Sequence, residues 1–435
     1  MDRNSLAIGI DFGTSFSSVG IYRRGKFEIV ANAAGNHRIP SCVAFTDKAR
    51  LLGEDALAQA DTDPSNAVLE VKRKLGGWKE DKLQVQFKGE TKAFHPEEIC
   101  GVILGNLKTM AERKLGQMVG SAVIAVPAGF TDGQRQAVLD SAAIAGVNVL
   151  RLVNEPTAAA ISNGINKKVI GEQWVLVCSI GGGHLDVSIM TIYNGVFEVK
   201  ATSGDNQLGG TDFDDRLLAH CVKEFRDKHS KDLSSSKEAI RRLRKACEQA
   251  KRTLSYTNQA LIDIEDLYEG RRFELLLNRD LFEELNRDLL DKIMLHVEMA
   301  LRRARKDRFA IHEIMLVGES SRIPKVQVML SEFFDRRSLC SSINSDEAVV
   351  VGASIAAAIL SGEKSPEIQD ILWLDLVPRS IGLVTESGTE DSPRILISRN
   401  STVPLKVKHR VKNFQEMQLL YEGESAIGFL DECLQ

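Results

Sequence analysis

The sequence predicts an α/β protein built of two similar halves that face each other across a cleft. Two regions about 170 residues apart begin alike, each with an apolar strand, a tight glycine turn, a second strand and a hairpin. The first begins with IGIDFGT at residues 8–14, and the second with VCSIGGG at residues 177–183. This separation is too long for a solenoid repeat, so we expect two facing α/β domains.

Apolar patterns place the remaining elements of both halves. In the first half we expect strands over residues 6–10, 18–22, 27–30, 42–45 and 122–126, and helices over residues 97–115 and 132–146. In the second half we expect strands over residues 174–177, 187–192 and 196–199, with a hairpin turn at Asn194-Gly195. Helices should then dominate to about residue 309, followed by a buried strand over residues 313–317.

One of these helices, within segment 232–255, has an amphipathic pattern. Apolar side chains three or four residues apart form one stripe, at Ile240, Leu243, Cys247, Ala250 and Leu254. Basic side chains lie outside the stripe, at Arg241, Arg242, Arg244 and Lys245. We interpret these four as a solvated face, the usual situation of charges on a helix surface.

The composition excludes several classes of protein. The 435 residues are 43% apolar and 27% charged, with a net charge of −4, so no overall attraction to nucleic acid or anionic membranes is expected. Seven cysteines without a C-x-x-C pair predict free thiols rather than disulfides or zinc ligands. The sequence also lacks the GxxxxGK[ST] loop and the GxGxxG fingerprint of two common nucleotide-binding folds.

The first residues lack the apolar core of a signal peptide, and the longest apolar stretch, residues 348–360, is too short to cross a bilayer. The last residues, DECLQ, are no retention signal. We therefore expect an intracellular protein of the cytosol, with the nucleus as a second location.

The composition changes near residue 370. A loop-like SGEKSP at residues 361–366 precedes an apolar run flanked by acids, DILWLD at residues 370–375. Strand-like segments follow at residues 380–385, 394–397 and 403–411. We expect a large α/β domain over residues 1–369, a linker over residues 370–375 and a small β-rich domain over residues 376–435.

Three glycine turns that follow apolar runs are suited to phosphate. They are DFGTS at residues 11–15, GGG at residues 181–183 and GGTD at residues 209–212. Glycine lets backbone N–H groups approach a phosphate without a Cβ clash. A single turn of this kind is more often a plain β-turn, but three beside Asp or Thr residues predict a phosphate site.

Six ordered motifs resemble the 70-kDa heat-shock chaperone family. They are IGIDFGT (8–14), NEPTAAAI (154–161), GGG (181–183), LGGTDFD (208–214), EQAKRTLS (248–255) and LVGESSRIP (316–324). The resemblance extends from about residue 6 to about residue 424. It implies an actin-like ATPase fold of two duplicated α/β lobes around a nucleotide cleft, followed by a partial β-sandwich. Actin and sugar kinases share this fold, but NEPTAAAI and the acid-flanked linker resemble the chaperones alone.

The resemblance implies a role for each matching residue, with ATP or ADP and Mg²⁺ as cofactors. The catalytic set is Asp11, Lys72, Glu155 and Asp186. Within this set, Asp11 would orient the waters of Mg²⁺ and Lys72 would position the attacking water. The phosphates would bind at Gly13, Thr14, Ser15, Gly181, Gly182, Gly183, Gly209 and Gly210. The adenosine would bind at Glu248, Lys251, Arg252, Ser255, Gly318, Ser320, Arg322 and Asp346. The four positions from 248 to 255 also share one helix face by their spacing alone.

Four positions depart from the family's motifs. Ser179 stands where the family has an aspartate that helps to fix Mg²⁺, and His184 stands where it has a threonine near the γ-phosphate. Glu319 replaces a glycine and would repel phosphate unless its side chain turned away, whereas Thr211 replaces an acid, a milder change. Because the loss of one such metal partner costs about 10- to 100-fold, we expect weak or absent hydrolysis with nucleotide binding retained.

Two further differences from the family pattern concern the substrate-binding parts. The chain is shorter than the pattern between Gly77 and Val85. After the linker we expect about half of the family's β-sandwich, without its helical lid and acidic tail. Arg151 resembles the family's arginine at the J-domain interface. The resemblance implies unfolded polypeptide clients, J-domain co-chaperones and nucleotide-exchange factors as partners, with neither nucleic acid nor membrane.

Three functions remain open at this point. The first is an ATP-dependent chaperone that assists folding by binding unfolded polypeptide. The second is a nucleotide-binding regulator or co-chaperone with little ATPase activity that works by binding a partner. The third is a sugar-kinase-like phosphotransferase, for which no feature of the sequence indicates a sugar pocket.

Overall fold

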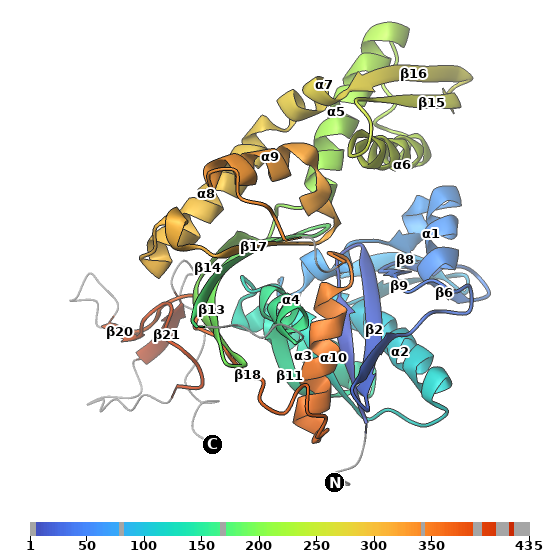
Figure 1. The fold of residues 1–435 in the computed structure, drawn as a ribbon. Coiled ribbons are helices and arrows are strands. Elements are labelled where there is room, and N and C mark those ends of the chain that lie inside the picture. The colour runs from blue at the N-terminus through green and yellow to red at the C-terminus, as the bar shows by residue number, and fades with distance from the viewer. Residues whose placement is uncertain are drawn as a thin grey trace.

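The fold is taken from a computed structural model, which describes residues 6–77, 82–165, 171–340, 344–385, 394–405 and 417–421. Its first lobe is built on a mixed sheet (Figure 1). The strands run in the order β11 (Asn148–Asn154), β10 (Ser121–Val126), β1 (Ala7–Phe12), β2 (Phe16–Arg23) and β3 (Lys26–Ile29), and β4 (Ile39–Pro40) pairs with β2. Helices α2 (Pro96–Leu115) and α3 (Asp132–Ile144) supply side chains to the apolar core of this lobe.

The second lobe repeats this plan. Its sheet runs in the order β17 (Glu313–Val317), β12 (Gln173–Ile180), β13 (Leu185–Tyr193), β14 (Val196–Asp205) and β18 (Leu372–Leu374). Strand β12 is parallel to β17 and antiparallel to β13, just as β1 is parallel to β10 and antiparallel to β2. The predicted duplication of an α/β unit is therefore confirmed.

Each lobe carries an outer part that projects towards the other lobe (Figure 1). On the first lobe this part holds α1 (Gly53–Thr62), the strands β5 (Val43–Phe45), β6 (Arg50–Leu52) and β7 (Ala67–Val68), and the hairpin of β8 (Leu83–Phe87) and β9 (Glu90–Phe94). On the second lobe it holds α5 (Gly210–His229), α6 (Lys237–Leu254), β15 (Gln259–Tyr268), β16 (Arg271–Asn278) and α7 (Arg279–Leu285). Helices α8 (Arg287–Ala304) and α9 (Pro324–Phe333) complete the second lobe.

Helices dominate the segment up to about residue 309, as predicted, but one hairpin within it was missed from the sequence. Strands β15 and β16 form an antiparallel hairpin between α6 and α7. Its turn uses Glu269 and Gly270, both at positive φ (50° and 71°), and side chains alternate between the core and solvent along β15. The alternation has period two, which marks a half-buried strand, but the exposed Leu261 and Leu276 interrupt the apolar–polar pattern in the sequence.

Two helices pack between the lobes beneath the cleft. Helix α4 (Glu155–Gly164) and helix α10 (Ala348–Ser361) contact each other closely and are almost entirely buried (Figure 1). A Cβ atom on Gly352 would lie 1.8 Å from the carbonyl oxygen of Ala158, so only glycine permits this crossing. Among the described residues, no helix is long and apolar enough to span a membrane.

The segment predicted as a linker is an edge strand. Residues 372–374 form β18, which pairs in parallel with β14, and Trp373 is buried. Beyond it, β19 (Ile381–Thr385) pairs with β20 (Arg394–Ile397) and with β21 (Met417–Tyr421) in a small antiparallel sheet. Most of the strand expected over residues 403–411, and most of the shortened segment between Gly77 and Val85, lie outside the described residues.

Candidate functional site

A cavity of about 650 Å³ lies between the two lobes. Its walls come from the β1–β2 turn and α1 of the first lobe, and from the β12–β13 turn, α6 and the turn after β17 of the second. Most of the residues that the motifs singled out line this cavity, although they are up to about 340 positions apart in the sequence.

The floor of the cavity is made by two strand turns that meet across the lobes. Gly13, Thr14 and Ser15 connect β1 to β2, and the triple glycine at residues 181–183 begins the connection from β12 to β13. A Cβ atom on Gly182 would lie 2.2 Å from the Ser15 Oγ, and one on Gly183 would lie 2.8 Å from the Thr14 Oγ1. The close approach explains why glycine occupies these positions, and it leaves backbone groups open to a ligand.

A third turn lies against the triple glycine. The Gly210 N–H donates to the Gly181 carbonyl at 2.9 Å, and a Cβ atom on Gly209 would lie 2.5 Å from the Gly183 nitrogen. Gly13, Thr14, Ser15, Gly181, Gly182 and Gly210 line the cavity, whereas Gly183 and Gly209 pack behind it. The three predicted phosphate turns thus form one continuous structure.

The catalytic set predicted from the sequence comes together at one end of the floor. Lys72, from the short helix η2 (Val71–Lys74), is 1% exposed, and its Nζ donates to the Glu155 Oε1 at 2.7 Å. Glu155 is the first residue of α4, Asp11 lies near the end of β1 and Asp186 lies in β13. Asp11, Lys72 and Glu155 line the cavity, whereas Asp186 is buried beside it and accepts from the Gly129 N–H at 3.2 Å.

This cluster holds more negative charge than its one lysine neutralises. Burial, and then the charge of Glu155, raises the pKa of both Asp11 and Asp186 to about 7. Among the described residues, the Asp186 Oδ2 is a buried oxygen without a hydrogen-bond partner. Within the part of the chain that the structure describes, no three acids lie close enough together to hold a metal ion directly. An unsatisfied carboxylate oxygen beside a glycine cradle therefore fits a phosphate with a cation that is held through water.

Two of the departures from the family motifs lie in this region. Ser179, near the end of β12, is paired with Asp186 in the sheet register and offers a hydroxyl where an acid would add charge. The ring of His184 is buried, and its Nδ1 lies 3.1 Å from the Thr14 Oγ1 of the other lobe. Burial, and then the charges of Lys72 and Arg73, keeps the pKa of His184 well below its ordinary value, so the imidazole is neutral at pH 7.

Arg73 is a site residue that the sequence reasoning missed. Its guanidinium donates to the Gly183 carbonyl at 2.8 Å and forms an ion pair with Asp212 at the start of α5. Arg73 belongs to the first lobe and both partners belong to the second. Its position next to Lys72 was the only signal in the sequence, because the partners are more than 100 residues away.

The predicted adenosine residues form the opposite wall. Glu248, Lys251 and Arg252 project from α6 into the cavity, and Gly318, Ser320 and Asp346 face them from the other side. The Lys251 Nζ is fixed by the Asp214 carboxylate at 2.6 Å, and the Ser320 hydroxyl donates to the Gly181 carbonyl at 2.9 Å. The wall is therefore joined to the phosphate floor.

Two predicted members of this wall lie outside the lining. Ser255 ends α6 and donates to the Lys251 carbonyl at 3.4 Å. Arg322 donates to the Asp346 carboxylate at 2.8 Å. They support the wall from behind in this conformation.

Glu319 lines the cavity and is held by two arginines. Its carboxylate pairs with Arg38 of the first lobe and with Arg252 of α6, the latter at 3.2 Å. Although burial acts in the opposite direction, the hydrogen bond and charge of Arg38, together with Arg252, hold the pKa of Glu319 below its usual value. Glu319 is therefore an ionised and paired side chain of the cavity wall.

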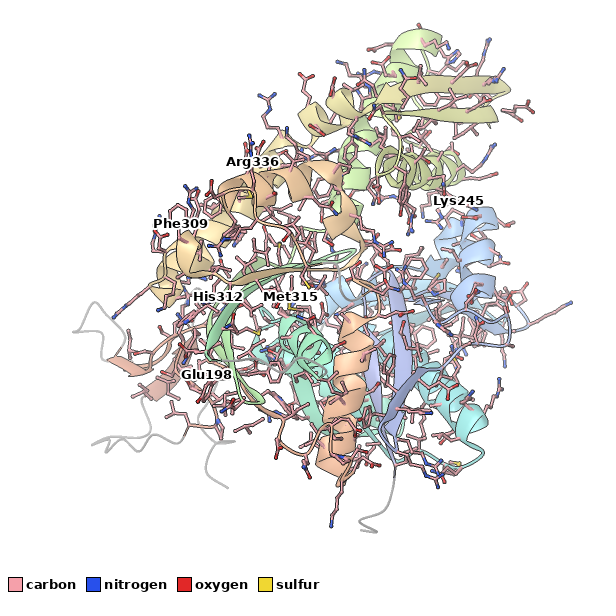
Figure 2. All side chains as sticks on the ribbon, viewed as in Figure 1. Glu198, Lys245, Phe309, His312, Met315 and Arg336 are labelled. Atoms are coloured by element: carbon pink, nitrogen blue, oxygen red, sulfur yellow. The ribbon has the colours of Figure 1, made fainter. Side chains whose placement is uncertain are left out.

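The basic side chains of α6 are not a freely solvated face, contrary to the sequence-based interpretation. Arg241 and Lys245 pair with Asp61 of α1 at 3.1 and 2.5 Å, which links the outer parts of the two lobes. Figure 2 shows Lys245 at the border of the cleft, facing α1. The other two are also engaged: Arg244 pairs with Asp215, and Arg242 donates to the carbonyls of Glu265 and Asp266.

The predicted linker contacts the base of the first lobe. The Asp375 carboxylate accepts from the Asn154 amide at 3.0 Å and from the Thr157 hydroxyl at 2.8 Å. Arg151 places its guanidinium 5.0 Å from the centre of the Trp373 ring. The segment after residue 370 is thereby connected to α4, whose first residue is the Glu155 of the catalytic set.

The comparisons with known proteins agree with this geometry. The family model described as Hsp70 protein matches residues 7–422. The heat shock 70 kDa protein 2 of Paracoccidioides lutzii is 47% identical over 97% of this chain and 68% of its own length. A ribosome-associated molecular chaperone of Zygosaccharomyces rouxii is 45% identical over 92% of this chain and 68% of its own length.

The chain belongs to the 70-kDa heat-shock protein family. This membership confirms the predicted actin-like fold with two duplicated lobes and a partial β-sandwich. It also confirms the prediction of an ATP-dependent chaperone resembling that family, whose members bind nucleotide. A relative from Dictyostelium discoideum, heat shock cognate 70 kDa protein 3, is 44% identical over 96% of the chain and 71% of its own length.

Proposed function

We propose that the chain is a nucleotide-regulated chaperone whose cleft binds ATP with Mg²⁺ and hydrolyses it slowly. The observation that carries this proposal is the buried, neutral His184, which bonds to Thr14 beside an acid cluster in which Ser179 supplies no charge. The cleft keeps its phosphate floor and adenosine wall, so binding is expected to survive.

The phosphates would bind over the three glycine turns, where Ser15 would donate its hydroxyl and Thr14 would do so only when its bond to His184 is broken. Mg²⁺ would be held through water by Asp11, and it would supply positive charge against the phosphate oxygens. Lys72 would orient a water molecule, with Glu155 fixing its ammonium at 2.7 Å. Glu248, Lys251 and Arg252 would contact the adenosine from α6.

Slow hydrolysis follows from the groups around this floor. A serine hydroxyl lacks the charge with which an aspartate would help to fix the metal and its waters, and the loss of such a partner costs about 10- to 100-fold. The neutral imidazole of His184 is bulkier than a threonine side chain. It also forms a hydrogen bond with the Thr14 hydroxyl, so that hydroxyl is not free to bind phosphate. Charge stabilisation of the transition state is the main contribution in phosphoryl transfer, so both changes reduce the rate.

A charge restoration tests this reasoning. Single-turnover hydrolysis of ATP is measured for the wild type, Ser179→Asp and Ser179→Asn, where asparagine is a neutral control of the same size as aspartate. We expect Ser179→Asp to raise the rate about tenfold or more, with Ser179→Asn no faster than the wild type. If Ser179→Asp hydrolyses ATP no faster than the wild type, or if Ser179→Asn raises the rate equally, the role of charge at this position is rejected.

A second candidate function is a nucleotide-binding regulator that acts through a partner with almost no turnover. The favouring observation is again His184, because its bond to Thr14 joins the lobes without any ligand. Tight ATP binding with no single-turnover product, even after Ser179→Asp, would favour this candidate. Binding with measurable turnover would favour the chaperone ATPase.

We further propose that residues 1–369 form the nucleotide-binding domain, residues 370–375 the linker and residues 376–435 the substrate-binding part. Unfolded polypeptide, J-domain proteins and nucleotide-exchange factors would be its partners, and the cytosol its location. The contacts of Asp375 and Trp373 with the first lobe support coupling between the linker and the cleft. Substitution of Arg151 by alanine should weaken any stimulation of turnover by a J-domain protein while leaving ATP affinity unchanged.

A further inference from the structure

Six charged side chains form a group at the adenosine wall; five of them line the cavity, and Arg322 lies behind Asp346. The carboxylates are Glu248, Glu319 and Asp346, and the guanidinium groups are Arg38, Arg252 and Arg322. Each carboxylate forms an ion pair: Glu248 with Arg252 at 2.9 Å, Asp346 with Arg322 at 2.8 Å and Glu319 with Arg38. Within this group of six, the negative and positive charges are therefore equal in number.

Arg38 is the member of this group that comes from the first lobe. It lies between β3 and β4, and its guanidinium is 4.5 Å from the centre of the Phe16 ring, which begins β2 directly after the Thr14-Ser15 turn. This cation–π contact, together with Glu319, fixes the direction of a long side chain that is only 30% exposed. Arg38 also lies 3.8 Å from Asp346.

The balance between positive and negative charges in this group depends on Arg38. Without it, Glu319 would share the Arg252 guanidinium, 3.2 Å away, with Glu248, so two carboxylates would have one cation. Both Arg38 and Glu319 line the cavity together with Asp346. A nucleotide brings several negative charges into this space, and an incompletely neutralised carboxylate in a part-buried wall opposes it.

We infer that Arg38 is a positioning residue for nucleotide binding: it neutralises Glu319 and holds that side chain in the cavity wall, so the phosphates meet no unpaired carboxylate. This inference rests on the proposed nucleotide cleft. It assigns a function to a residue that no motif singled out, and it explains how a glutamate is accommodated at a position next to the glycine floor.

The test compares a charged and an uncharged ligand. Dissociation constants for ATP and for adenosine are measured at low salt for the wild type, Arg38→Gln, Arg38→Lys, Glu319→Gln and the double variant Arg38→Gln/Glu319→Gln. We expect Arg38→Gln to weaken ATP binding about two- to fivefold, the effect of one part-buried ion pair, and to weaken binding of the uncharged adenosine distinctly less. Arg38→Lys keeps the charge and should retain most of the affinity. The double variant should return to the wild-type value, and Glu319→Gln alone should bind ATP at least as tightly as the wild type.

Arg272→Gln serves as the matched control, because Arg272 pairs with Asp263 on the exposed β15–β16 hairpin, away from the cavity. It should change neither constant. An equal loss of ATP and adenosine binding in Arg38→Gln, or a double variant as weak as the single one, would overturn the inference and leave the nucleotide site intact. A wild type that binds neither ligand would instead overturn the proposed function.

Discussion

The replacement of Lys72 by methionine should destabilise the empty protein as well as remove a group that we propose to be catalytic. Lys72 is 1% exposed, forms a 2.7 Å ion pair with Glu155 and lies near two buried acids, Asp11 and Asp186. Removal of one partner from a buried ion pair costs about 3–5 kcal/mol, because the remaining charge is left without compensation. Since Glu155 keeps 14% of its side-chain exposure, we expect the lower end, about 3 kcal/mol.

The loss of stability in Lys72→Met should depend on pH. The pKa of Asp11 and that of Asp186 are raised to about 7 from an ordinary value of 3.8, so the folded protein binds protons more tightly than the unfolded chain. The stability tied to these two acids is present at low pH and is lost as the pH rises through about 7. Without the lysine, ionisation becomes still less favourable, and Lys72→Met should lose more stability at pH 8 than at pH 6.

The assay is urea unfolding followed by tryptophan fluorescence at both pH values. The matched control is Lys72→Met/Glu155→Gln, which removes both charges and should regain at least half of the lost free energy while remaining inactive. A cost below about 1 kcal/mol for Lys72→Met, or a double variant as unstable as the single one, would refute the reasoning from an uncompensated charge.

Two further predictions concern the acid cluster and the helix crossing. Binding of ATP with Mg²⁺ at pH 7 should release protons, because the pKa of Asp11 is about 7 and the cation requires the ionised form; calorimetry in two buffers of different ionisation heat would show this, and equal heats would contradict it. Gly352→Ala should lower the free energy of unfolding by about 1–3 kcal/mol, because the new Cβ would lie 1.8 Å from the Ala158 carbonyl. Gly105→Ala in α2 is the control: the nearest atom is 3.9 Å away, so its higher helix propensity should stabilise the protein by up to about 1 kcal/mol, and equal effects would reject the packing argument.

Local patterns were sufficient for the two-lobe framework. The strand–turn–strand repeat at Asp11 and at Ser179 follows from periodicity and from glycine turns, both of which are local in the sequence. The stripe on α6 was predicted for the same reason: Leu243, Cys247 and Leu254 are buried in the core of the second lobe. The grouping of motif residues around one cavity then followed from the resemblance to a family, since spacing alone leaves the relative position of distant turns open.

Ion pairs across the cleft could not be predicted from the sequence. Asp61 meets Arg241 from 180 positions away, and Arg38 meets Glu319 from 281 positions away. Charged residues follow no periodicity that identifies such pairs, so Arg241 was interpreted as solvated and Arg38 was not noticed. The β15–β16 hairpin was missed for a different reason: Leu261 and Leu276 lie on its exposed face and interrupt the alternation of apolar and polar residues.

The departures from the family change the charge of the cleft at its two ends in opposite directions. Ser179 removes a negative charge beside Asp11, Glu155 and Asp186, where burial already raises the pKa of two of these acids. Glu319 adds one at the adenosine end, where Arg38 neutralises it. A cluster with one acid fewer attracts a divalent cation less strongly, whereas the added glutamate is paired with Arg38, so it does not face the nucleotide as an unpaired charge. Metal affinity and turnover should therefore decrease together while nucleotide affinity is retained, which is the combination that a slow, nucleotide-regulated binding protein requires.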